Sequence, residues 1–157
     1  IETLERRARE EFGAVDVLMN NAGIGPGSSL FGDGEAWRRV LEVNLWGIIH
    51  GSRVFAPAMI ASGRPGLIVS TGSKQGITTP PGDPAYNISK AGVKAFTEAL
   101  QHELRNTKGA QVTAQLREAG VEVVGTSPQE TTQWITRERS RWAEVVRKSG
   151  TAIEGAA

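Results

Sequence analysis

The chain has 157 residues, with 18 Lys and Arg against 17 Asp and Glu, a formal net charge of +1 and no cysteine. The length corresponds to one domain with a core of its own, and the charge balance gives no bulk electrostatic reason to expect a nucleic acid or an anionic membrane as partner. The absence of cysteine excludes a disulfide framework, a thiolate metal site and a cysteine nucleophile, and it agrees with a cytoplasmic location.

Helical and strand patterns alternate along the first part of the chain. Apolar residues at helical spacing predict helices over 1–12, 35–61 and about 85–106. Short apolar runs predict buried strands over 15–19 and 67–70, whereas 112–116 fits either an alternating strand or a helix continuing to residue 120. Strands alternating with helices predict an α/β fold with a parallel, doubly wound sheet. We expect neither a membrane span nor a secretory signal.

The composition changes after Gly109. A short apolar run predicts a strand over 121–124. Ser127 and Glu130 then form a capping box around Pro128, which predicts a helix that ends near residue 150. We therefore expect two parts, 1–115 and 116–157, the second being a strand and an amphipathic helix.

The most informative pair of residues is Tyr86 and Lys90. Their i, i+4 spacing places a phenol and an ammonium group on one face of a helix. A neighbouring cation stabilises phenolate, so a tyrosine in this setting can exchange a proton with a substrate oxygen. The alternative is an amphipathic helix in which the two residues coincide by chance.

Three further sites of polar residues accompany this pair. Ser73 lies 13 residues before Tyr86, directly after a predicted strand, where doubly wound folds bind ligands. Asn44 lies inside an apolar helical stretch, where its low helix propensity needs a reason. The segment Asn20–Gly23 follows the first predicted strand, and its small residues would let a flat ligand approach the backbone. The alternatives are that Ser73 is an ordinary loop serine and that Asn44 makes a buried side-chain hydrogen bond. For the segment Asn20–Gly23 the alternative is a simple turn from strand to loop.

The ordered motifs N-N-A-G, V-N-L-x-G, Ser and Tyr-x-x-x-Lys resemble the short-chain dehydrogenase/reductase family over about residues 1–115. The resemblance implies a partial Rossmann-like sheet and reversible hydride transfer between NAD or NADP and a small-molecule carbonyl/alcohol pair. Tyr86 would be the general acid/base, and Lys90 would lower its pKa and bond the nicotinamide ribose. Ser73 would hold the substrate oxygen, Asn44 would anchor a water in the proton relay, and Asn21, Ala22 and Gly23 would lie along the cofactor.

Two departures from the family pattern are expected to matter. The family's first βαβαβ portion with its Gly-rich phosphate turn, on the order of 60 residues, is missing from this sequence, and with it the residue that selects NAD or NADP. The stretch of about 116–154 instead resembles the C-terminal segment of tripartite tricarboxylate solute-binding proteins. Its alternative is an unusual terminal helix packed on the sheet. A fragment or a fusion of two units would explain both departures.

The sequence therefore leaves three functional hypotheses. The first is a short-chain oxidoreductase that lacks part of its cofactor site and is inactive or active only in a larger assembly. The second is a non-catalytic α/β module that associates through an exposed sheet edge, and the third is a relative of solute-binding proteins. Removing strands from a parallel sheet exposes an apolar edge, so we expect a homo-oligomer. His50 and His102 lack carboxylate partners at ligand spacing, so we interpret both as structural and expect no metal.

Overall fold

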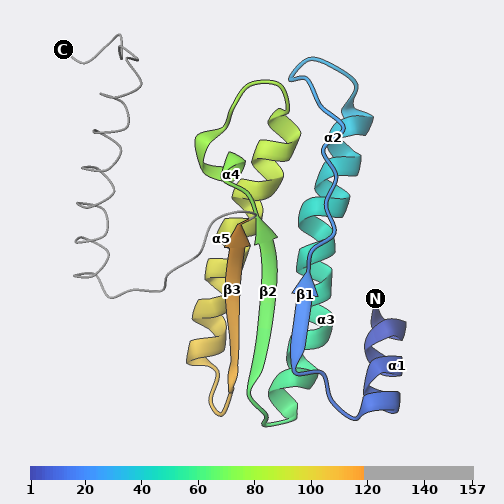
Figure 1. Cartoon of the computed structure of the whole chain (residues 1–157), viewed down its shortest axis with the longest axis vertical. Helices are drawn as coiled ribbons and strands as arrows, with labels where there is room; N and C mark the ends of the chain where they lie inside the picture. The colour runs from blue at the N-terminus through green and yellow to red at the C-terminus, as the bar shows by residue number, and fades with distance from the viewer. Residues whose placement is uncertain (119–157) are drawn as a thin grey trace, which may run out of the picture. The chain divides into compact units, whose positions relative to one another are not determined.

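The structure is a computed structural model that describes residues 1–118, and its centre is a parallel sheet with the strand order β1-β2-β3 (Figure 1). The strands are β1 (Val17–Asn20), β2 (Gly66–Gly72) and β3 (Val112–Glu118). Val17 pairs with Leu67 and Gly66 pairs with Val112, so all carboxyl ends meet at one edge. The predicted α/β class with a parallel sheet is confirmed, and 112–116 belongs to a strand.

Helices precede or connect these strands, and their predicted positions are close to the observed ones. The predicted helix over 35–61 is one continuous rod whose middle turn is a π-helix, and a one-turn helix after β2 was not predicted. The helical elements are α1 (Glu2–Phe12), α2 (Gly34–Leu41), η1 (Glu42–Trp46), α3 (Gly47–Ala61), α4 (Gln75–Thr78) and α5 (Pro84–Asn106).

Local chemistry explains where the long helices begin. Asp33 caps α2, because its carboxylate accepts a hydrogen bond from the backbone N–H of Glu35 at 3.0 Å. Asp83 caps α5 in the same way through the N–H of Tyr86, and Pro84 follows at the first helical position, where its missing N–H costs nothing. Both helices therefore start at fixed residues, which places Tyr86 in the first turn of α5.

The core lies between the sheet and the helices α3 and α5, near the amino ends of the strands. In Figure 1 both helices lie behind the sheet. Apolar side chains from α3, β2, α5 and β3 form one buried cluster, and burying such side chains is the main favourable contribution to folding. The cluster consists of Phe55, Ala56, Met59, Ile68, Leu104, Val112 and Ala114.

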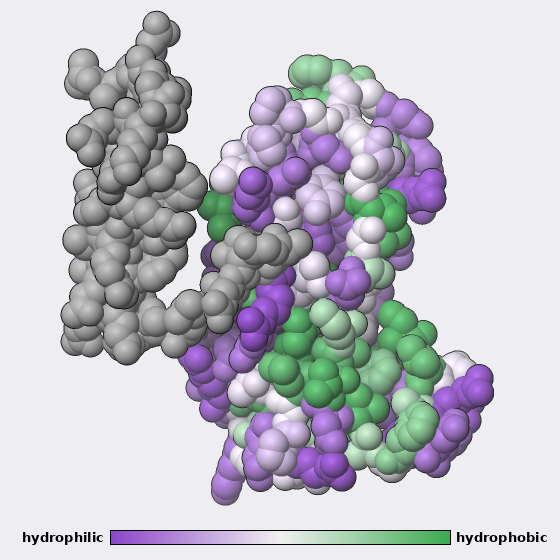
Figure 2. Space-filling view, in the orientation of Figure 1, coloured by the Kyte–Doolittle hydropathy of each residue, from purple (hydrophilic) through white to green (hydrophobic). Residues whose placement is uncertain are grey.

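The opposite face of β1 is open to solvent, which corrects one prediction. The apolar run over 15–19 predicts a buried strand, yet Val17 and Met19 are 62% and 63% exposed, while the alternate residues Leu18 and Asn20 are half-buried. In the part of the chain that the structure describes, no helix covers this face, and Figure 2 shows apolar surface in this region. The strand is therefore half-buried, with the period-2 alternation of a sheet that is covered on one side.

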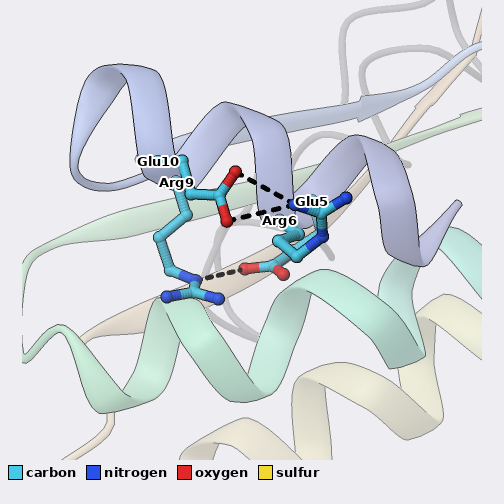
Figure 3. A network of polar contacts seen from close by, with 4 residues as sticks. All are labelled: Glu5, Arg6, Arg9 and Glu10. Atoms are coloured by element: carbon cyan, nitrogen blue, oxygen red, sulfur yellow. Dashed lines mark hydrogen bonds and ion pairs between the residues drawn. The ribbon is translucent and has the colours of Figure 1, made fainter.

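Helix α1 carries charged pairs along its surface rather than buried residues. Arg6 contacts Glu10 at 3.1 Å, and Arg9 contacts Glu5 at 3.2 Å (Figure 3). Pairs at i, i+4 on an exposed helix each contribute about 0.3–0.5 kcal/mol, so they support the helix only slightly. Among residues 1–118, no helix has the length and apolar composition that crossing a membrane requires.

The predictions for the end of the chain fall outside residues 1–118. These are the strand over 121–124, the helix from Ser127 to about residue 150, and the resemblance of the tail to solute-binding proteins. The division into 1–115 and 116–157 also stays a prediction.

Candidate active site

The site is built where the carboxyl ends of β1 and β2 meet the start of α5. Asn20 ends β1 and points back to the core side, where its amide donates to Ser52 Oγ at 3.0 Å. Asn21 accepts a hydrogen bond from Thr71 Oγ1 on β2 at 2.9 Å. Asn21, Ala22 and Gly23 are all exposed, so this backbone segment is accessible to a ligand.

Lys90 is the buried cation of this site. Only 3% of the residue is exposed, and its Nζ donates to the carbonyl oxygen of Thr71 at 2.9 Å. The same Nζ lies 5.7 Å from the centre of the Tyr86 ring. The helical spacing of the two residues therefore does bring them together, and Thr71 holds the ammonium group at the end of β2.

Burial lowers the pKa of Lys90 below its ordinary value of 10.5, because the charged form loses hydration. Between the lowered folded value and 10.5, the unfolded chain binds more protons than the folded chain, so the free energy of unfolding rises with pH in that window. We expect the wild type to gain stability relative to Lys90→Met as the pH is raised toward 10.5, as measured by urea unfolding.

A matched control for this measurement is Lys94→Met on the same helix, because the Lys94 side chain is 42% exposed and pairs with Glu98 at the surface. This variant should keep the pH trend of the wild type. Parallel pH trends in the wild type and Lys90→Met would contradict the assignment of this dependence to Lys90.

Asn44 lies in the π-helical turn η1 and is fully buried. Its Oδ1 accepts from the N–H of Ile24 at 2.8 Å, and its Nδ2 donates to the Ile24 carbonyl at 2.8 Å and to Ser89 Oγ at 3.2 Å. The amide thus joins the loop after β1 to η1 and to α5. These three hydrogen bonds explain why an asparagine lies in the middle of the helix. Single π-helical turns inside α-helices occur frequently at functional sites.

Ser73 follows β2 directly and is half-buried. Its Oγ accepts a hydrogen bond from the N–H of Gln75 at 3.2 Å, which starts α4. Within residues 1–118 this is the only hydrogen bond of the Ser73 side chain, and none joins it to Tyr86. The structure therefore places Ser73 at the carboxyl edge of the sheet without a direct bond to the Tyr86 and Lys90 pair.

Some residues that build the site carry no signal in the sequence. Thr71 contacts both Asn21 and Lys90, but a threonine at a strand end is unremarkable by type. Asp83 could have been found, since an Asp before Pro84 at the start of a helix is a typical N-cap. The two histidines take no part: His50 and His102 are exposed, and His50 stacks on Trp46. Within residues 1–118, no group of three potential metal ligands comes together.

Comparison with known proteins gives consistent matches. A family model described as short chain dehydrogenase matches residues 1–142. The 3-oxoacyl-(acyl-carrier-protein) reductase FabG of Haemophilus influenzae is 36% identical over 105 residues, which is 66% of this chain and 43% of that sequence. The chain spans between 18% and 47% of the length of several curated relatives that it matches.

Solved structures match in fold as well as in sequence. A short chain dehydrogenase/reductase from Burkholderia phymatum in complex with NAD is 42% identical with a TM-score of 0.71, covering 74% of this chain and 42% of that chain. A metagenomic short-chain oxidoreductase in complex with NADP is 32% identical with a TM-score of 0.68, covering 76% of this chain and 53% of that chain.

Proposed function

The chain belongs to the short chain dehydrogenase family, and on this premise we propose that it contributes the proton-transfer half of an NAD(P)-dependent oxidoreductase site. The observation that carries the proposal is the buried Lys90 ammonium, held by Thr71 at 2.9 Å and lying 5.7 Å from the ring of Tyr86. A cation near a half-buried tyrosine favours proton exchange between the phenol and a carbonyl or alcohol oxygen, because it stabilises the phenolate. The family match favours this function over a non-catalytic module.

We assign the roles as follows. The Tyr86 hydroxyl gives a proton to the substrate oxygen during reduction and takes it back during oxidation, and Lys90 stabilises the phenolate form. Ser73 donates a hydrogen bond to the same substrate oxygen, because within residues 1–118 its hydroxyl serves only as an acceptor, from the N–H of Gln75. Asn44 keeps the loop after β1 in place through Ile24 and supports a water in the proton relay.

The exposed segment 21–23 fits a nicotinamide cofactor, which would supply or accept the hydride. A Cβ atom added to Gly23 would lie 3.6 Å from both Asn44 Oδ1 and Lys90 Nζ, so the glycine leaves room for a ligand to approach these polar groups. Asn21 is fixed by Thr71, which keeps its backbone in position. NAD and NADP both remain candidates.

The substrate in this proposal is a small carbonyl or alcohol, and the protein is located in the cytoplasm.

A homo-oligomer is part of the proposal. The exposed side chains of Val17 and Met19 lie on the sheet face that no described helix covers, and an exposed apolar face of this kind favours association. A second copy that covers it would remove these side chains from water.

Nicotinamide binding tests the proposal directly. NADH and NADPH are titrated into the purified chain by calorimetry, with the oligomeric state measured in the same buffer. We expect saturable binding with a micromolar dissociation constant, weakened in Gly23→Val because the larger side chain obstructs the segment 21–23. Gly34→Val, where an added Cβ meets nothing within 4 Å, should bind as the wild type does. A folded chain that binds neither nucleotide would contradict the proposal for this chain.

A further inference from the structure

A cluster of hydrogen bonds centred on Asp83 fastens the loop after β1 to the first turn of α5. The Asp83 carboxylate accepts from the N–H of Tyr86 at 3.3 Å, from Ser28 Oγ at 2.6 Å and from the N–H of Gly27 at 3.2 Å. The first of these bonds is an ordinary helix cap, whereas the other two come from a loop 55 or more residues earlier in the chain. Asp83 therefore does more than start the helix.

Ser28 completes this arrangement from the side of the loop. Its hydroxyl donates to Asp83 Oδ1 and at the same time accepts from the N–H of Ala85 at 2.9 Å. Two neighbouring N–H groups at the start of α5, which the helix itself cannot satisfy, are thus bonded by Asp83 and Ser28 together. Ser28 is half-buried, so water competes poorly for these bonds.

The loop that is fastened in this way passes close to the Tyr86 ring. A Cβ atom on Gly25 would lie 3.4 Å from Cδ2 of the Tyr86 ring, which is van der Waals contact, and 3.8 Å from Asp83 Oδ2. Gly27 has a φ of +84°, a backbone conformation that favours glycine, and its N–H bonds to Asp83. The bonds of Asp83 and Ser28 therefore hold the loop segment that lies beside the Tyr86 ring.

We propose that Ser28 and Asp83 form a latch that positions Tyr86 for proton transfer, so that both are positioning residues for the reaction. This inference rests on the proposed function, since the latch matters to chemistry only if Tyr86 carries the proton. Releasing the latch leaves Lys90 buried but lets the Tyr86 ring move relative to it and to the substrate. Misplacement by about 1 Å can cost about a hundredfold in rate, so the loss should appear in kcat more than in KM.

Three variants separate the latch from the helix cap. Ser28→Ala removes the hydroxyl that joins the loop to Asp83 and Ala85, and it leaves the Asp83 carboxylate bonded to the N–H groups of Tyr86 and Gly27. Asp83→Ala removes the helix cap together with the bonds to Ser28 and Gly27. Asp83→Asn keeps an oxygen for Tyr86 and Ser28 but has no acceptor for Gly27. Asp33→Ala is the matched control, because Asp33 caps α2 through Glu35 without contact to Tyr86.

The first measurement needs no activity, because Tyr86 is the only tyrosine of the chain. With labelled tyrosine, its ring gives a single set of NMR signals. We expect these signals to shift or broaden in Ser28→Ala and Asp83→Ala, to change less in Asp83→Asn, and to match the wild type in Asp33→Ala and in Ser28→Thr, which retains the hydroxyl. Tyrosine signals in Ser28→Ala that are identical to those of Asp33→Ala would overturn the latch.

The second measurement is turnover with the nicotinamide cofactor. Ser28→Ala should reduce kcat by about 10- to 100-fold with little change in KM, whereas Asp33→Ala should reduce neither. Equal kcat values in these two variants would also overturn the latch. If the wild type binds no nicotinamide, the proposed function fails, while the tyrosine signals still decide whether Ser28 and Asp83 position the ring.

Discussion

Replacing Tyr86 by Phe is expected to reduce turnover by about a hundred- to ten-thousand-fold, the range that a general acid or base usually contributes. The change removes one oxygen and keeps the aromatic ring, beside which Gly25 lies. Within residues 1–118 the Tyr86 hydroxyl makes no hydrogen bond to the protein, so its loss leaves no buried partner unsatisfied. Folding and nicotinamide binding should therefore be retained, and the loss should lie in the chemical step.

The measurement is steady-state turnover with a panel of simple carbonyl compounds and NADH or NADPH, together with cofactor affinity for each variant. Ile88→Ala is a suitable control, because Ile88 lies two positions later on α5 and is 51% exposed. This control should turn over at nearly the rate of the wild type. Undiminished turnover in Tyr86→Phe would remove Tyr86 from its proposed role and leave the proton to another group.

The second large effect is expected on stability, from Gly76→Ala in the short helix α4. A Cβ atom at this position would lie 2.6 Å from the carbonyl carbon of Lys90, 2.7 Å from the nitrogen of Ala91 and 2.8 Å from the Lys90 oxygen. These are backbone atoms of α5, which cannot move aside as a flexible side chain can. Inserting a methyl group into such a contact typically costs about 1–3 kcal/mol.

The same substitution should disturb the site, because Ser73 is joined to Gly76 by a backbone hydrogen bond of 3.0 Å. If α4 moves away from α5, Ser73 moves with it, and turnover should fall together with the free energy of unfolding. Chemical unfolding in urea measures the stability. Gly34→Ala is the control: its Cβ meets nothing within 4 Å, so its stability should equal or slightly exceed that of the wild type. An unchanged stability of Gly76→Ala would show that α4 does not press on α5 as described.

Much of the framework could be predicted from sequence because it depends on local patterns. Apolar periodicity located the helices α1, α2 to α3 and α5, and the i, i+4 rule brought Tyr86 and Lys90 onto one face. The strand β3 was ambiguous, because Val112 and Ala114 fit both periods over so short a run. Its pairing with β2, from Gly66 opposite Val112 onward, decides in favour of a strand.

What could not be predicted depends on contacts between distant segments. The apolar run that contains Val17 and Met19 gave no sign that one side of β1 is exposed, since exposure depends on which elements cover the sheet. The link from Ser28 to Asp83 joins residues 55 positions apart, and although Asp83 is recognisable as a helix cap, nothing in either segment indicates that Ser28 bonds to it. The helix α4 has four residues, too few for a periodic pattern. The roles of Tyr86, Lys90, Ser73, Asn44 and the segment 21–23 stay predictions.

Under the proposed function the two ends of the sheet serve separate purposes, and this bears on how the chain can change by mutation. The packed cluster around Met59 and Val112 lies near the amino ends of the strands, whereas Thr71, Ser73 and Lys90 belong to the carboxyl ends. Substitutions at sites that share no contacts have effects that add nearly independently. Variation at the carboxyl edge can therefore alter what is bound or transformed while the amino-end packing keeps the chain folded, so one half of the molecule can diversify while the other is held constant.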